Sequence, residues 1–208
     1  MDTAFCPTCQ VIQPTTGNVD YFRLFSLQFS FSLAVEQLEE NYQSLQRQFH
    51  PDRFASRSAT ERRLSLEHVT RINQAYQTIR DPLLRSEYLL ERLGYRVADP
   101  GQSEPQDPAF LMEVMEQREA LEAVDLSAAG AAQQLGRMRE ETERCLEQDE
   151  AQLARLFASC LPAEAGREAV CAPELRQQIV RVNHRLRYHR RFLEALDQAE
   201  ENISEQGV

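Results

Sequence analysis

Lysine is absent from the sequence, and arginine supplies all 23 basic side chains. This absence excludes chemistry that needs a lysine amine, such as a phosphate-loop lysine or a Schiff base. The 7 glycines never fall in a Gly-x-Gly-x-x-Gly pattern, so the fingerprint of dinucleotide binding is missing as well. No apolar run approaches the ~18 residues of a membrane-spanning helix. We therefore expect neither a nucleotide-binding enzyme nor a membrane protein.

Positive charge is scarce in the second half of the chain. Residues 1–96 hold 11 arginines and 11 acidic residues, whereas residues 97–208 hold 12 arginines and 22 acidic residues. The whole net charge of −10 thus arises after residue 96. Because an acidic surface repels nucleic acid and anionic lipid, we expect neither as a main partner. The asymmetry predicts two units with different partners.

Cysteine is sparse, with five residues in 208, and does not suggest a disulfide framework. The odd count, spread over the chain, fits a reducing cytoplasm best. The first residues lack a basic segment and a long apolar segment, so we expect no secretory signal. Cys6 and Cys9 form one Cys-x-x-Cys pair, but a structural zinc site needs about four ligands and a redox pair needs a βαβ context. We expect no metal and no cofactor, and zinc binding by this pair between chains is the alternative. The other three are interpreted as buried structural thiols: Cys145, Cys160 and Cys171.

Apolar residues recur at steps of three and four along most of the chain, which predicts an all-α fold. The stretch Val97–Phe110, with three prolines and a glycine, is the best candidate for a linker. We predict an N-terminal tail at 1–19, a four-helix unit at 20–96, the linker at 97–107, and a three-helix bundle at 108–208. Asp81-Pro82 and Asp107-Pro108 are typical of helix starts, and Gly94 is typical of a helix end. The predicted buried face of the helix that ends at residue 49 comprises Val35, Leu38, Tyr42, Leu45 and Phe49.

The stretch LQRQFHPDRFAS (Leu45–Ser56) ends that helix abruptly, because proline removes a backbone donor and restricts the residue before it. Two amphipathic helices flank the tripeptide, so they are expected to form a hairpin with His50, Pro51 and Asp52 at its exposed tip. Such a tip suits polar contacts with another protein. Catalysis by the histidine and the aspartate is not expected, because a tip offers no pocket that excludes water. A proline-terminated helix with incidental polar neighbours is the alternative.

The segment DPAFLMEVMEQREALEAV (107–124) carries two apolar faces where a surface helix needs one. Phe110, Val114 and Leu121 form the predicted core stripe. The opposite face combines flexible methionines with carboxylates, which favours a partner-binding surface. Packing of Leu111 and Met112 under the linker or the first unit is the alternative.

Several motifs, in this order, resemble the HscB family of J-domain co-chaperones. They are YFRLF, the HPD stretch quoted above, INQAYQTIRDPLLRSEYLL, AFLMEVMEQREAL and, near the C-terminus, RFLEAL. The resemblance spans residues 20–203 and identifies 20–96 as a J-domain and 108–208 as a scaffold-binding domain. It implies an adaptor and no enzyme. Members of the family bind the iron–sulfur scaffold IscU and, through the J-domain turn, stimulate the ATPase of HscA, a DnaK-type chaperone, for cluster transfer.

The resemblance also implies which residues make these contacts. Those expected to bind an HscA-type chaperone are His50, Pro51, Asp52, Arg47 and Arg53. Those expected to bind an IscU-type scaffold are Leu111, Met112, Met115, Glu116, Glu119 and Phe192. A J-domain co-chaperone with an unrelated client is the alternative, and a metal or redox enzyme that uses the Cys-x-x-Cys pair is a third class.

Two departures from the family pattern stand out. J-domains usually present a basic helix before the turn, but here that helix carries Arg47 against three glutamates, and the positive charge lies beyond the turn. The alternative is that these arginines lie on an ordinary solvated surface and do not contact a chaperone. Ala123 stands where the family often has a further acid, so one exposed contact worth ~1 kcal/mol or less is expected to be lost.

Overall fold

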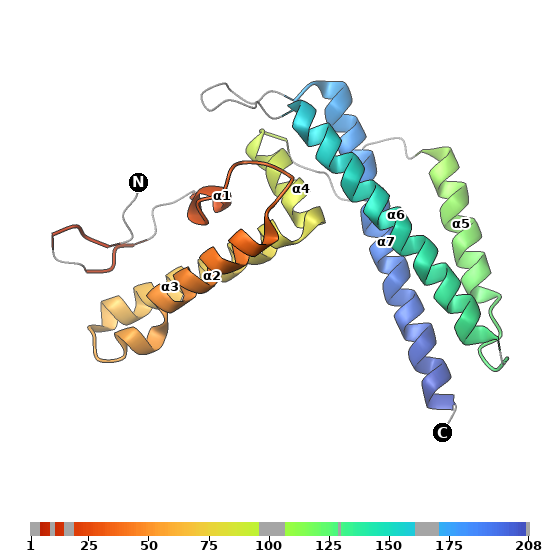
Figure 1. The fold of residues 1–208 in the computed structure, drawn as a ribbon, viewed down its shortest axis with the longest axis horizontal. Coiled ribbons are helices and arrows are strands. Elements are labelled where there is room, and N and C mark those ends of the chain that lie inside the picture. The colour runs from red at the N-terminus through yellow and green to blue at the C-terminus, as the bar shows by residue number, and fades with distance from the viewer. Residues whose placement is uncertain are drawn as a thin grey trace. The chain divides into compact units, whose positions relative to one another are not determined.

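A computed structural model describes residues 5–8, 11–14, 19–95, 107–128, 130–160 and 171–206. Every regular element within these residues is helical, apart from one isolated bridge between Phe5 and Ile12, which confirms the all-α fold (Figure 1). The elements are, in chain order, α1 (Tyr21–Leu24), α2 (Val35–Phe49), the 3₁₀ helix η1 (Pro51–Phe54), α3 (Ala59–Arg80), α4 (Pro82–Arg92), α5 (Pro108–Glu122), α6 (Ala131–Cys160) and α7 (Pro173–Gln206). None of these described helices combines the length and the apolar character that a membrane crossing requires.

The chain divides into two compact units, Met1–Tyr88 and Leu89–Val208, and each is described by itself. The division falls inside α4. Most of the predicted linker at 97–107 lies outside the described residues. The domain boundaries drawn from the sequence therefore stay predictions.

The helix ends follow the capping signals of the sequence. At the start of α3, the Glu61 N–H donates to Ser58 Oγ at 3.2 Å and the Ser58 N–H donates to Glu61 Oε2 at 3.1 Å, which is a capping box. Asp81 and Asp107 accept backbone hydrogen bonds of 2.9 and 3.1 Å at the starts of α4 and α5. Gly94 follows α4 at φ +84°, in the left-handed region that glycine enters most easily. The predicted starts of both helices and the glycine cap are thus confirmed.

The first unit is built on a hairpin of α2 and α3, whose facing stripes bury Leu38 and Ile72. Tyr42 and Tyr76 stack across the hairpin with ring centroids 4.0 Å apart. Val35 was expected on the buried face but is exposed. It is the first residue of α2, where a side chain has helical neighbours on one side only.

The second unit consists of two long helices, α6 and α7, which lie side by side, and the shorter α5 (Figure 1). Leu135 of α6 and Leu196 of α7 belong to one cluster of buried hydrophobic side chains. Arg139 of α6 ties the same two helices together at the surface, with a hydrogen bond of 2.9 Å to Glu200. Among the described residues of α5 none is fully buried. Helix α5 is therefore the least embedded helix of this unit.

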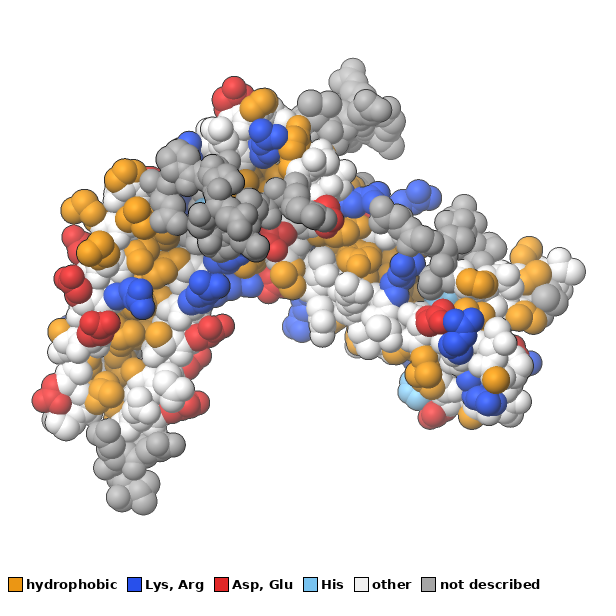
Figure 2. Space-filling view, turned by 180° about the vertical axis from the view of Figure 1, so that it is seen from behind, with side chains coloured by type: hydrophobic (Ala, Val, Ile, Leu, Met, Phe, Trp, Pro, Cys, Tyr) orange, Lys and Arg blue, Asp and Glu red, His pale blue; other side chains and the backbone are white. Residues whose placement is uncertain are grey.

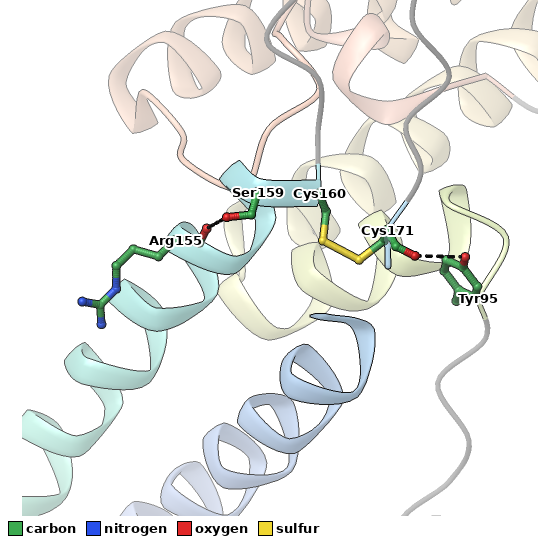
Figure 3. The surroundings of a disulfide bond; sticks show 5 residues. All are labelled: Tyr95, Arg155, Ser159, Cys160 and Cys171. Atoms are coloured by element: carbon green, nitrogen blue, oxygen red, sulfur yellow. Dashed lines mark hydrogen bonds between the residues drawn. A yellow bond between two sulfur atoms is a disulfide. The ribbon is translucent and has the colours of Figure 1, made fainter. Parts of the chain in front are cut away.

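Two cysteines that the sequence suggested to be separate thiols form a disulfide in the structure. Cys160 is the last residue of α6, and Cys171 lies just before α7 (Figure 3). Their Cα atoms are 4.6 Å apart, within the range that a disulfide spans. The Tyr95 hydroxyl donates to the Cys171 carbonyl at 3.3 Å beside it. Sequence alone could not predict this pairing, because it depends on two helix ends 11 positions apart returning to the same place.

Candidate functional site

The His-Pro-Asp turn is a short capped helix and not an irregular loop. Helix α2 ends at Phe49, and His50 adopts the extended backbone that proline imposes on its predecessor. Pro51 then opens η1, where its missing N–H costs nothing because the first amides of a helix have no internal partner. The His50 side chain completes the cap, since its Nδ1 accepts from the Asp52 N–H at 3.3 Å. The sequence missed η1, which turns residues expected in a loop into an ordered tip.

The structure brings the five predicted chaperone-binding residues together at this tip. The His50 Nδ1 and the Asp52 carboxylate are 3.5 Å apart, and both side chains are exposed. Arg53 Nη1 donates to the Arg47 carbonyl at 3.2 Å, which satisfies one of the free carbonyls at the end of α2. The tip thus presents both signs of charge on a fixed backbone, suited to polar contacts with a protein.

Beneath the tip lies a set of contacts that the sequence did not predict. The Ser65 hydroxyl of α3 donates to the Phe49 carbonyl at 2.7 Å. Phe49 also stacks on His68 of α3 at 4.4 Å and on Phe5 of the N-terminal segment at 5.2 Å. Phe54 of η1 is buried below the turn. These contacts fix the tip to both helices of the hairpin.

Basic side chains beyond the turn are engaged in local contacts. Arg62 donates to the Arg57 carbonyl at 2.8 Å, and Arg63 pairs with Glu67 one helical turn further on. All four side chains are exposed. These basic side chains lie beyond the turn in the chain, as the sequence predicts.

Helix α5 presents the predicted second apolar face to solvent. Its inner face packs on α7: Phe110 meets Tyr188 edge to face at 5.7 Å, and the Tyr188 hydroxyl donates to the Val114 carbonyl at 3.2 Å. On the outer face Leu111 is 40% exposed. Met112 and Met115 are 63% and 61% exposed. Hydrophobic and acidic side chains also alternate on the part of the surface formed by the second unit in Figure 2.

A pocket of about 350 Å³ adjoins this face, between α5, α6 and α7. Leu111 and Val114 line it from α5, and Arg181, Tyr188 and Arg191 line it from α7. No sequence pattern predicts this pocket, because arginines spaced along α7 could equally belong to a solvated face. The outer surface of α5 therefore has an acidic border on its own helix and a basic border on α7.

Five of the six predicted scaffold-binding residues are exposed on α5, and the sixth is not. Glu116 and Glu119 join Leu111 and the two methionines on the surface. Phe192 of α7 is only 5% exposed and belongs to the core that includes Leu135 and Leu196. Its ring has little surface in this structure, and its role in scaffold binding stays a prediction.

The cysteine pair near the N-terminus is described only in part. The Cys6 N–H donates to the Val11 carbonyl at 2.9 Å, whereas Cys9 lies outside the described residues. Elsewhere three potential metal ligands meet, from one helix each: Glu113, Cys145 and His189. This cluster was not predicted, because its members lie far apart in the sequence, at positions 113, 145 and 189.

Comparison with known proteins identifies the family. A family model described as the HSCB C-terminal oligomerisation domain matches residues 106–197. The chaperone HscB from Vibrio cholerae is 30% identical to this chain, with a TM-score of 0.71, and the match covers 89% of this chain and 99% of that one. This chain belongs to the HscB family.

Two further structures agree with this assignment. Human co-chaperone protein HscB is 27% identical with a TM-score of 0.81, and the match covers 96% of this chain and 91% of that one. The Jac1 co-chaperone from Saccharomyces cerevisiae, at 20% identity and a TM-score of 0.60 over 87% of this chain and 94% of that one, shows the shared fold. As a member of the HscB family the chain is a J-domain co-chaperone of iron–sulfur cluster assembly. The family works with Hsp70-type chaperones and scaffold proteins.

Proposed function

We propose that this protein binds an IscU-type iron–sulfur scaffold and delivers it to an HscA-type chaperone, whose ATPase it stimulates. The chaperone contact is assigned to the tip of the α2–α3 hairpin, and the scaffold contact to the outer face of α5. The protein acts by binding and performs no chemistry of its own.

The preorganised tip supports the chaperone contact. Pro51 and the capping bond from Asp52 to His50 fix the backbone before any partner arrives. A rigid segment loses little conformational entropy on binding, so more of its contact energy is available to act on the partner. The proposed contact residues are His50, Pro51, Asp52, Arg47 and Arg53.

The exposed apolar face of α5 is the observation that carries the scaffold contact. Met112 and Met115 keep more than half of their surface in water, which is unfavourable unless a partner covers it. Methionine adapts its shape to a partner, and the pocket beside Leu111 can receive an apolar side chain. Glu116 and Glu119 on one border and the arginines of α7 on the other would fix the orientation of a partner with both signs of charge.

The test is an ATPase assay with a purified HscA-type chaperone and an IscU-type scaffold. We expect this protein and the scaffold together to accelerate ATP hydrolysis, and His50→Gln to abolish the acceleration without weakening scaffold binding. Ser56→Ala is the matched control, because it changes an exposed residue just past the turn that makes no proposed contact.

Equal acceleration by His50→Gln would refute the chaperone contact. Acceleration by the wild-type protein that is independent of the scaffold, together with no scaffold binding in calorimetry, would instead favour the alternative of an unrelated client.

A further inference from the structure

The second unit contains a cluster of three side chains that the proposed function does not use. Glu113 comes from α5, Cys145 from α6 and His189 from α7. A carboxylate oxygen, the thiol sulfur and a ring nitrogen all lie within 4.8 Å of one another. None of these groups lines the pocket beside Leu111.

His189 carries the strongest indication that the cluster holds a ligand. The residue is 3% exposed, and its Nδ1 lies 3.2 Å from the Asp149 carboxylate. The other ring nitrogen, Nε2, is buried and has no hydrogen-bond partner in the described part of the chain. A buried polar atom without a partner is unfavourable, because it loses its hydrogen bonds to water. The pairing of one nitrogen with a carboxylate is also how proteins orient a histidine that binds a metal through the other nitrogen.

The donor atoms themselves suit a cation. Glu113 brings a carboxylate oxygen to the thiol of Cys145 and the ring of His189, and metal binding to a thiol displaces its proton.

We propose that Glu113, Cys145 and His189 form a binding site for a divalent transition-metal cation of the zinc class. Sulfur, imidazole nitrogen and carboxylate oxygen are the ligands that zinc takes, and three protein ligands leave a fourth position open for water or a partner's ligand. Ligand atoms in such a site lie about 3.5 Å apart, so the cluster must contract by roughly 1 Å. Glu113 is exposed at the surface of α5, and its side chain can make that movement.

Metal binding would join α5 to the α6–α7 pair. Helix α5 has no fully buried residue of its own, and its outer face carries the proposed scaffold contacts. The cation therefore stabilises the placement of the helix on which those contacts lie. The metal site is independent of which partner the face binds.

The experiment uses the full chain with Cys6→Ser and Cys9→Ser, which removes the N-terminal pair as a competing site. Metal-free protein is titrated with Zn²⁺ against a chromophoric chelator, and with Co²⁺ to detect the thiolate-to-cobalt absorption band. We expect one equivalent of metal and a clear band. Cys145→Ser is expected to abolish the band, and Glu113→Gln to weaken Zn²⁺ binding at least tenfold.

Glu122→Gln is the control, since it neutralises another exposed carboxylate of α5 outside the cluster and should leave the affinity unchanged. Thermal melts without metal check the fold of each variant. Because Glu113 is exposed, its variant remains informative even if a change at His189 disturbs the core. Less than one equivalent at micromolar Zn²⁺, or a cobalt band that survives Cys145→Ser, would overturn the proposal.

Discussion

Replacing Met112 and Met115 together by alanine tests the proposed scaffold surface directly. Both side chains project from the outer face of α5 and are 63% and 61% exposed. Neither belongs to the core of the second unit. The double variant should therefore keep its fold and its melting temperature. It should lose only the binding free energy that comes from a partner covering these side chains.

The size of the loss follows from the exposed fractions. Complete burial of a methionine side chain is worth about 1.5–3 kcal/mol, so covering the exposed parts contributes about 1–2 kcal/mol for each residue. Alanine retains one methyl group, and the binding free energy of an interface is smaller than its buried apolar area alone predicts, because association also costs entropy. We therefore expect a loss of about 2 kcal/mol, which raises the dissociation constant roughly 30-fold.

Isothermal titration calorimetry with a purified IscU-type scaffold measures this change. Leu66→Ala is the matched control, because Leu66 is a comparable apolar residue, 55% exposed, on α3 of the other unit. It should leave the dissociation constant unchanged. A double variant that binds as tightly as the wild type, or a control that weakens binding equally, would show that α5 does not carry the contact.

Three further predictions concern stability. Leu153→Ala should lower the free energy of unfolding by about 2–5 kcal/mol in urea titrations, because its side chain is fully buried between α6 and α7; a loss below 1 kcal/mol would contradict that packing. Gly94→Ala should lower the free energy of unfolding by about 1–2 kcal/mol through its φ of +84° alone, since an added Cβ meets no atom within 4 Å. Gly136→Ala inside α6 should instead raise the free energy of unfolding by about 0.5–1 kcal/mol. Thermal melts in which both variants shift the melting temperature in the same direction would refute this. Hydrogen bonds from the Ser58 side chain and backbone lower the pKa of Glu61 in the folded protein, so the stabilisation by its carboxylate is present above the ordinary glutamate pKa and is lost as pH falls through the lowered value. The difference in melting temperature between the wild type and Ser58→Ala should accordingly narrow on acidification, and a constant difference from pH 7 to pH 3 would count against the capping box.

Local signals predicted most of the fold. The period of apolar residues predicts the helices, because each must bury one face. The capping residues Ser58, Asp81, Asp107 and Gly94 set helix ends through contacts only a few residues away. The turn at His50 was predictable for the same reason, since proline acts on its immediate neighbours.

Features that depend on tertiary packing were missed. Phe192 lies on the edge of the apolar stripe of α7, and only the packing of that helix against α6 decides that its ring is buried. Phe54 became a core residue because η1 turns it back beneath the hairpin tip. The disulfide between Cys160 and Cys171 requires two helix ends to meet.

The cluster of Glu113, Cys145 and His189 shows the same limit most clearly. Metal sites are recognised in sequences by short spacings, because two ligands on one turn or one helix are automatically close. Here each helix contributes a single ligand, so no spacing carries a signal. What brings them together is the packing of α5 on the α6–α7 pair, and Asp149, one helical turn from Cys145, orients the histidine across that contact. Sites of this kind arise only once three faces are placed against one another, so they are found by searching a structure for buried nitrogen atoms that lack a partner.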